Sequence, residues 1–417
     1  MPRYHALDAL RGFALLLGVF YHAAESFEAH HLTWAIIDAD ANRVLAFLRF
    51  MSHSFRMETF FLLAGFFARL VILKRGLHSF TLNRIQRILV PLVVGWFILY
   101  PLCIAIWIKG AQVSGNYAFI QIPEEARSLP VWKLWLGFIL GGAWTHTFSL
   151  THLWFLHQLL VIYLLFCSLR SLAMRFLPPI PLLAQLEQLT AKAANSPLGW
   201  LALIPLTLPA LLLMDGYNIN TPMNSLIPEP GPTALYGLCF SIGWWLHRNS
   251  HLLQIVPLHR HLWLTIAPLA TCAAWWFSDC TRVLGLNHLP SEILRTLFWT
   301  CYAFAMWGFT LGCLGLFLHH VREESRTWRY IADSSYWVYL AHLPLVVSLQ
   351  IWVAYWPVHW TLKYTAIIGI ALPILYLTYH YFVRSTRIGR QLNGRTWPFH
   401  PLPPWLASKP RVGSQDS

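Results

Sequence analysis

Charged residues are scarce in this chain, and acidic residues are the scarcest of them. Only 11% of the 417 residues are charged, with 17 Asp and Glu against 30 Lys and Arg. About a quarter of the residues in an average soluble domain are charged, so the composition excludes an ordinary soluble domain. Hydrophobic residues make up 57% of the chain, and the mean hydropathy is +0.50. These values predict an integral membrane protein, and the 22 Trp and 16 Tyr fit residues that favour the membrane boundary.

Cysteine motifs and internal repeats are also missing. The seven cysteines form no Cys-x-x-Cys pair, and most lie within apolar runs. We therefore interpret them as small buried side chains and predict neither a metal site nor a disulfide framework. No period of 20–50 residues recurs, which excludes repeat architectures. No small-residue cleavage site follows the first apolar run, so we expect this run to be retained as a membrane span.

The net charge of +13 comes from short basic clusters that lie between apolar segments. In a soluble protein such an excess would suggest nucleic-acid binding. Here the clusters have the pattern of topology signals and of lipid headgroup contacts. We therefore expect the lipid bilayer, and no nucleic acid, among the partners.

Apolar stretches long enough to cross a bilayer occur ten times. They lie at residues 10–27, 55–73, 88–108, 152–169, 198–214, 233–247, 262–278, 296–318, 334–354 and 362–383. Basic loops then alternate with neutral or acidic loops, which predicts that both termini are cytoplasmic. The stretch 131–147 would invert every later loop if it were an eleventh span, so we expect it on the outer surface. The sequence predicts an all-α, polytopic transmembrane bundle of about ten spans over residues 1–384, with a loosely ordered cytoplasmic tail at 385–417.

The first span contains two ionisable residues, Arg11 and His22. Eleven residues turn a helix by about 1100°, roughly 20° past three full turns, so both side chains share one face about 16 Å apart. Arg11 lies at the cytoplasmic end, where it either holds an anionic group, pairs with Asp8 or extends to lipid headgroups. His22 lies toward the outer end, where an intramembrane histidine suggests a functional site. Histidine is also the commonest general base near neutral pH.

Other polar residues of the predicted spans form two clusters. The inner, basic cluster contains Arg11, Arg84 and Arg87. The outer cluster contains His22, His53, Arg56, Glu58, His152 and Trp154. His342 lies near the middle of the ninth span beside Pro344, where a role in a pocket and a role at a helix kink are both open. The other residues also have structural alternatives, as ion-pair partners, topology signals or helix caps.

The motifs LDALRG, FFLLAGFF, RIQRILVP, HLWFL and SYWVYLAHLP, together with the spacing of Arg11 and His22, span residues 5 to about 384. In combination they resemble the acyltransferase family 3 membrane proteins. HSFRMETFFLLAGFF and HLWFLHQLLVIYL are most similar to the branch of this family that succinylates periplasmic glucans. Many other members carry an acidic pair shortly after the HLW-like motif, whereas this chain has the sequence FLHQ at 155–158.

The resemblance implies transfer of an acyl group from cytoplasmic acyl-CoA to a hydroxyl of an extracytoplasmic carbohydrate, in the bacterial inner membrane. Succinyl-CoA is favoured as the donor and acetyl-CoA is open; the expected acceptor is a periplasmic glucan or another extracytoplasmic glycan. No permanently bound cofactor is expected, and a homo-oligomer is possible. The rival classes are a transporter of a carbohydrate or an organic anion, and a scaffold without chemistry. Against the transporter, the sequence shows no inverted repeat.

Roles for the polar residues follow from the same comparison. His22 would act as the general base, directly on the attacking hydroxyl or by way of a transient acyl-enzyme. Arg56 would stabilise the oxyanion or orient a carboxylate-bearing acyl group, and Glu58 completes the predicted catalytic set. The residues expected to bind substrate or acyl-CoA are Arg11, Arg84, Arg87, His53, His152, Trp154 and His342.

Overall fold

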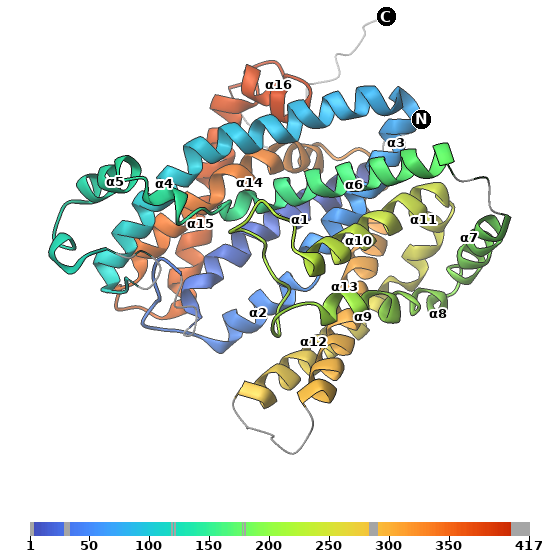
Figure 1. Ribbon diagram of the computed structural model, residues 1–417, viewed down its shortest axis with the longest axis horizontal. Helices are drawn as coiled ribbons and strands as arrows, with labels where there is room; N and C mark the ends of the chain where they lie inside the picture. The colour runs from blue at the N-terminus through green and yellow to red at the C-terminus, as the bar shows by residue number, and fades with distance from the viewer. Residues whose placement is uncertain are drawn as a thin grey trace, which may run out of the picture.

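The computed structural model describes residues 4–28, 34–117, 120, 122–176, 178, 181–282 and 291–401. Within these residues the chain forms helices and no strands, which confirms the predicted all-α class (Figure 1). The central helix is α1 (His5–Ala24), which contacts α3 (Arg56–Arg84), α13 (Ser291–His320), α14 (Arg326–Val353) and α15 (Trp360–Thr378). Side chains on α1 can therefore meet groups from several other helices.

Six helical stretches in the described part of the chain are long and apolar enough to cross a membrane. They are His5–Phe27, Arg43–Ser114, Thr151–Phe176, Glu292–His320, Arg326–Val353 and Trp360–Val383. Seven of the ten predicted spans fall within these stretches. The other three predicted spans, 198–214, 233–247 and 262–278, correspond to shorter or less apolar helices, so the count of ten stays a prediction. These helices are α8 (Pro197–Trp200), α9 (Leu203–Leu212), α10 (Pro230–Arg248) and α12 (Arg260–Arg282).

The longest stretch contains two predicted spans, 55–73 and 88–108, and a change of direction between them. Gly76 in α3 has φ +76°, a left-handed conformation that glycine adopts without steric penalty. A π-helical turn, Ile85–Leu89, then leads into α4 (Val90–Ser114). The kink therefore separates the two apolar segments, and the basic residues between them lie near the turn.

Helices α3 and α10 approach each other closely through two glycines. A Cβ atom at Gly65 would collide with the backbone carbonyl of Phe240, and one at Gly243 would collide with the backbone carbonyl of Leu62. This agrees with the packing role that small residues have between membrane helices. Glycine at both positions is required by the close approach of the two backbones.

Replacing Gly243 with leucine is expected to destabilise the fold by about 1–3 kcal/mol or more, because the new side chain would force α3 and α10 apart. Gly237→Leu on the same helix is the matched control, since a Cβ at Gly237 meets no atom within 4 Å. The midpoint of thermal unfolding in detergent measures both. Equal shifts in the two variants would contradict the close contact.

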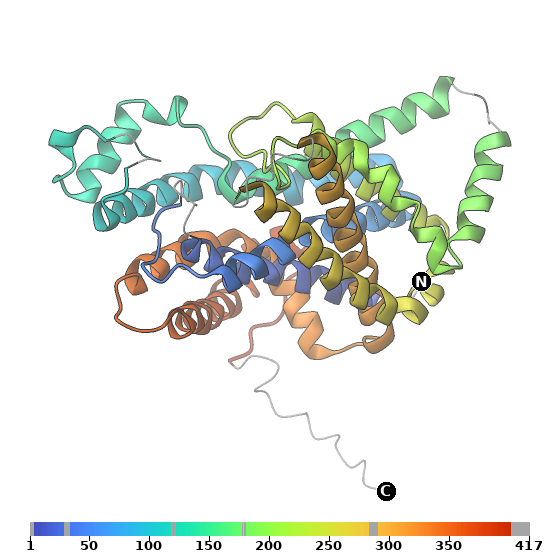
Figure 2. The same ribbon diagram turned by 90° about the horizontal axis from the view of Figure 1, so that it is seen from below.

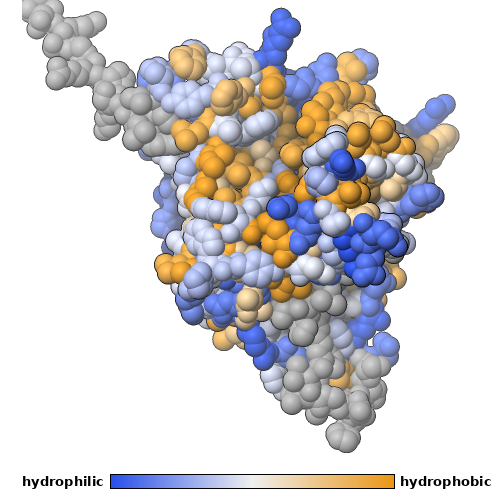
Figure 3. Space-filling view, turned by 90° about the vertical axis from the view of Figure 1, so that its left-hand side faces the viewer, coloured by the Kyte–Doolittle hydropathy of each residue, from blue (hydrophilic) through white to orange (hydrophobic). Residues whose placement is uncertain are grey.

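The predicted surface segment 131–147 contains α5 (Val131–Leu140). Ten helical residues rise about 15 Å, half the thickness of a bilayer core, so α5 is too short to cross it. Trp132 and Leu140 are 61% and 77% exposed. The end of the molecule that carries α5 has polar residues among apolar ones, as Figure 3 shows.

The C-terminal part of the described chain packs beside the start of α4. Helix α16 (Arg387–Asn393) is capped by Gly394, and the Leu392 carbonyl accepts a hydrogen bond from Arg87 at 2.7 Å. Arg395 then pairs with Asp333 at 2.8 Å. Figure 2 shows the molecule from below. Residues 402–417 of the predicted tail lie outside the described residues.

Candidate active site

Five of the six residues of the predicted outer cluster line one cavity of about 290 Å³, which we call the outer cavity. They are His22, His53, Arg56, His152 and Trp154. Helix α1, helix α2 (Arg43–His53), α3, α4, and the residues at the start of α6 (Trp154–Phe176) contribute to its walls. The contact of α1 with α2 and α3 brings segments distant in sequence to the same space.

The three arginines of the predicted inner cluster line a second cavity of about 260 Å³, the inner cavity. Arg11 is 3.4 Å from Asp8, so the predicted i,i+3 ion pair is present beside the cavity. The guanidinium of Arg87 donates to the Leu392 carbonyl, and Arg84 stacks over the Phe80 ring at 5.0 Å. This cavity therefore gathers three cations and one nearby carboxylate.

A third, narrow cavity of about 40 Å³ lies between these two, and we call it the neck. It shares Leu15, Phe155 and Tyr339 with the inner cavity. It shares His22, Arg56, His152 and Trp154 with the outer cavity. His342 lines the neck as well. The three spaces follow one another, and the predicted basic and histidine clusters lie at opposite ends of the series.

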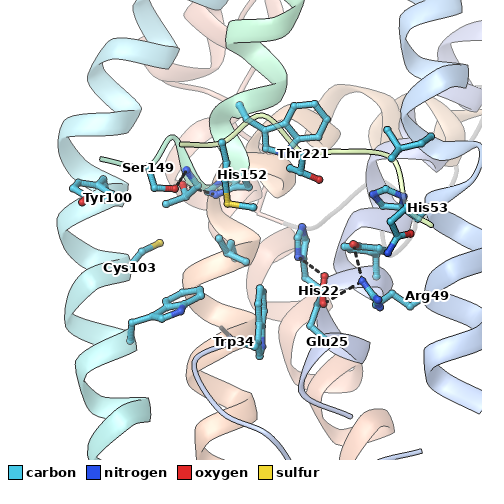
Figure 4. Close-up of a pocket in the computed structure, with 18 of the residues that line it drawn as sticks. His22, Glu25, Trp34, Arg49, His53, Tyr100, Cys103, Ser149, His152 and Thr221 are labelled. Carbon is cyan, nitrogen blue, oxygen red and sulfur yellow. Dashed lines mark hydrogen bonds and ion pairs between the residues drawn. The ribbon is translucent and has the colours of Figure 1, made fainter. Parts of the chain in front are cut away.

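The His22 ring lies beside the Glu25 carboxylate and the Trp34 indole. Its Nδ1 is 3.9 Å from Oε1 of Glu25, and its ring is parallel to that of Trp34 within 7°, with centroids 5.9 Å apart. Gln350 accepts a hydrogen bond from the Trp34 indole at 2.9 Å and donates one to the His22 carbonyl at 2.7 Å. Figure 4 shows His22 and Glu25 with Trp34 on one side and Arg49 on the other. This arrangement places a carboxylate beside the ring, whose Nδ1 has no hydrogen-bond partner among the described residues.

Glu25 and Arg49 also line the outer cavity, and the sequence did not single them out as site residues. Arg49 from α2 lies 3.5 Å from Oε2 of Glu25, donates to the Tyr21 hydroxyl at 3.1 Å and pairs with Glu28. The spacing of Glu25 three residues after His22 was the one available signal, because i,i+3 side chains are neighbours on a helix. The role of Arg49 depends on the packing of α2 against α1 and has no local signature.

Arg56 is a buried cation that makes no ion pair among the described residues. Arg56 is only 8% exposed, and its guanidinium carbon lies 4.4 Å from the centroid of the Tyr21 ring. Its Nε has no hydrogen-bond partner in the described part of the chain. A buried charge is costly unless it is paired, so this guanidinium is well placed to receive an anionic group of a ligand.

Glu58 does not join the other predicted catalytic residues, because it lines none of the three cavities. It is fully buried, and its electrostatic neighbours include Tyr236 and Tyr302. Arg56 is an electrostatic neighbour of Glu58 as well, but only Arg56 of the two lines the neck. The sequence placed them together because they are close along the chain.

The remaining outer residues are held by neighbouring helices. The His53 ring stacks on Tyr21 with centroids 5.5 Å apart. His152 contacts α14 twice: its Nε2 donates to the Leu340 carbonyl at 3.0 Å, and its own carbonyl accepts from the Tyr339 hydroxyl at 2.7 Å. Both nitrogens of His152 therefore have partners, since Thr151 contacts Nδ1 at 3.3 Å.

Comparison with known proteins agrees with these motifs. Residues 4–380 match the model of a family described as an acyltransferase domain, acyltransferase 3. Glucans biosynthesis protein C of Escherichia coli (strain K12) is 27% identical over 161 residues, 38% of this chain and 37% of that relative. The proteins of the same name from Escherichia coli O1:K1 / APEC and O157:H7 (strain EC4115 / EHEC) match to the same extent. The match thus spans little more than a third of these relatives' length. No solved structure matches the chain.

Proposed function

This chain belongs to the acyltransferase 3 family, and from that premise we propose that it moves an acyl group across the membrane. The donor is acyl-CoA at the cytoplasmic face, and the acceptor is a hydroxyl of an extracytoplasmic carbohydrate. The observation that carries the proposal is the series of inner cavity, neck and outer cavity, with three arginines at one end and His22 at the other. The expected location is the bacterial inner membrane.

The inner cavity suits the nucleotide end of coenzyme A. Its phosphates are polyanionic, and guanidinium groups bind phosphate through paired hydrogen bonds. The pantetheine arm would extend through the neck along α1, whose axis rises about 16 Å between Arg11 and His22. The thioester would then arrive beside Arg56 and His22.

His22 would take the proton from the acceptor hydroxyl as its oxygen attacks the acyl carbonyl carbon. The Glu25 carboxylate, 3.9 Å from Nδ1, would stabilise the imidazolium that forms. Arg56 N–H groups would stabilise the oxyanion, or bind a distal carboxylate of the acyl group. The second possibility favours succinyl over acetyl, because only succinyl brings an anion to pair with the buried guanidinium.

The name of the matched relatives refers to glucan biosynthesis, which makes a periplasmic glucan the preferred acceptor. Mass spectrometry of periplasmic glucans from cells making wild type, His22→Ala or no protein tests this. Equal membrane levels of the two forms are the control. A succinyl-sized mass found only with wild type supports the proposal; identical glucans from wild-type and protein-free cells would refute the glucan acceptor.

Replacing Arg87 with glutamine is expected to raise KM for acyl-CoA about tenfold and leave kcat nearly unchanged, because a hydrogen bond to a charged group contributes about 1.5–3 kcal/mol. Steady-state kinetics of the purified protein measure this. Arg75→Gln is the matched control, since Arg75 is exposed and does not line the inner cavity. A KM unaffected in both variants would mean that Arg87 acts only as a topology signal or a structural contact.

A further inference from the structure

His342 is a buried histidine in the neck, and the mechanism above gives it no chemical step. We propose that His342 is a second catalytic residue, which takes the acyl group from the donor and passes it to the acceptor as a transient acyl-imidazole. The inference rests on the proposed function, because it assigns the route by which the acyl group crosses the neck.

The hydrogen bonds of His342 fix which nitrogen is reactive. Its Nδ1 lies 2.6 Å from the Tyr339 carbonyl, and a carbonyl oxygen only accepts, so Nδ1 carries the proton. Nε2 of the neutral ring therefore keeps its lone pair. His342 is 3% exposed, and its Nε2 atom is buried and has no hydrogen-bond partner among the described residues. By contrast, His152 donates from Nε2 to a backbone carbonyl, which removes that nitrogen as a nucleophile.

Nε2 and the Arg56 guanidinium face the same point of the neck. A Cβ atom built on Gly18 would lie 3.9 Å from His342 Nε2 and 3.2 Å from Arg56 Nη1. A carbonyl group placed beside Gly18 would thus meet a nucleophilic nitrogen and an oxyanion donor together. Both groups therefore border the space beside Gly18, and the neck has room for a carbonyl group there.

The neck and the neighbouring ring supply the remaining requirements. A cavity of about 40 Å³ has room for a carbonyl group but not for a thioester and a sugar ring together. The His22 ring lies on the outer side, with its centroid 5.1 Å from that of His342. A covalent carrier between the two cavities lets donor and acceptor react in turn, and His22 is placed to serve the second half-reaction.

The steps balance as follows. The Nε2 lone pair attacks the thioester carbonyl carbon, the C–S bond breaks, and its electron pair leaves as the coenzyme A thiolate. Because Nδ1 keeps its proton, the adduct is an acyl-imidazole in its cationic form. The thiolate takes up one proton from the solvent at the inner cavity, which balances the proton that His22 later releases on the outer side. The acceptor oxygen then attacks the acyl carbon while His22 removes the hydroxyl proton. The C–N bond breaks, its electron pair returns to Nε2, and His22 releases its proton to water on the outer side.

Isotope exchange tests the covalent step. Purified protein is incubated with succinyl-CoA and labelled coenzyme A, without any glucan, and label in succinyl-CoA is measured. We expect exchange with wild type and a loss of at least about 100-fold in His342→Gln, for both exchange and transfer. His22→Gln should lose transfer to glucan but keep exchange. His380→Gln is the control for removing a buried histidine, since His380 is 2% exposed and lies outside the three cavities.

Quenched wild-type protein gives a second readout that needs no variant. Peptide mass spectrometry should find the acyl mass on the peptide containing His342. Transfer to glucan without exchange and without this adduct would overturn the carrier role and leave the proposed function standing. Loss of exchange in His22→Gln, with the adduct on the His22 peptide, would overturn it in favour of His22. Wild type that neither transfers nor exchanges would refute both proposals.

Discussion

Replacing His22 with alanine is expected to lower the rate of acyl transfer by about 100- to 10,000-fold, the usual contribution of a positioned general base. KM for acyl-CoA should change little, because we propose that the arginines of the inner cavity hold the donor. The Glu25 carboxylate would remain in place, paired with Arg49. Steady-state kinetics with glucan as the acceptor measure the effect.

The matched control is His380→Ala. His380 is a buried histidine that, like its partners the Tyr330 hydroxyl and the His400 carbonyl, lines none of the three cavities. This variant should keep wild-type kinetics if it folds. A His22→Ala protein that retains more than about a tenth of the wild-type rate would contradict the general-base role.

Replacing Lys363 with methionine is expected to cost about 3–5 kcal/mol of stability, because it leaves the Asp38 carboxylate buried without its cation. The Lys363 ammonium lies 2.7 Å from Asp38 Oδ1 and also donates to the Ala354 carbonyl at 2.9 Å. Both side chains of the pair are at most 3% exposed. The ion pair connects the segment that contains Trp34 to the start of α15. Its loss should therefore also make the part of the outer cavity beside His22 less ordered.

Denaturant unfolding in detergent measures this cost. The double variant Asp38→Leu with Lys363→Met should recover most of the lost stability, since an apolar pair of similar volume often replaces a buried ion pair without penalty. Arg43→Met is the control, because Arg43 is 75% exposed in its pair with Asp279 and exposed pairs contribute about 0–1 kcal/mol. Equal effects of Lys363→Met and Arg43→Met would contradict the account.

Helix periodicity explains what the sequence predicted well. The rotation per residue is a local property, so Arg11 and His22 could be assigned to one face before any packing was known. The structure places their side chains in the inner and outer cavities, which are joined by the neck. Glu58 lines none of the three cavities, although it is an electrostatic neighbour of Arg56, and its catalytic role stays a prediction.

Other features depend on packing and could not be predicted. Arg49 reaches the site because α2 lies against α1, and the lone pair of His342 is identified only by the Tyr339 carbonyl opposite its other nitrogen. The span count was uncertain for a related reason. Helix α10 is not among the helices apolar enough to cross a membrane, yet it packs closely against α3 at Gly65 and Gly243 and also contacts α6 and α9.

The central claim is that one protein joins a donor on one side of a membrane to an acceptor on the other. Protein reconstituted in vesicles, with succinyl-CoA added only outside and periplasmic glucan enclosed only inside, tests it by mass spectrometry of the recovered glucan. We expect succinylated glucan with wild type and none with His22→Ala. Glucan that stays unmodified in sealed vesicles, yet is succinylated when detergent mixes the two compartments, would contradict transfer through the inner cavity, the neck and the outer cavity.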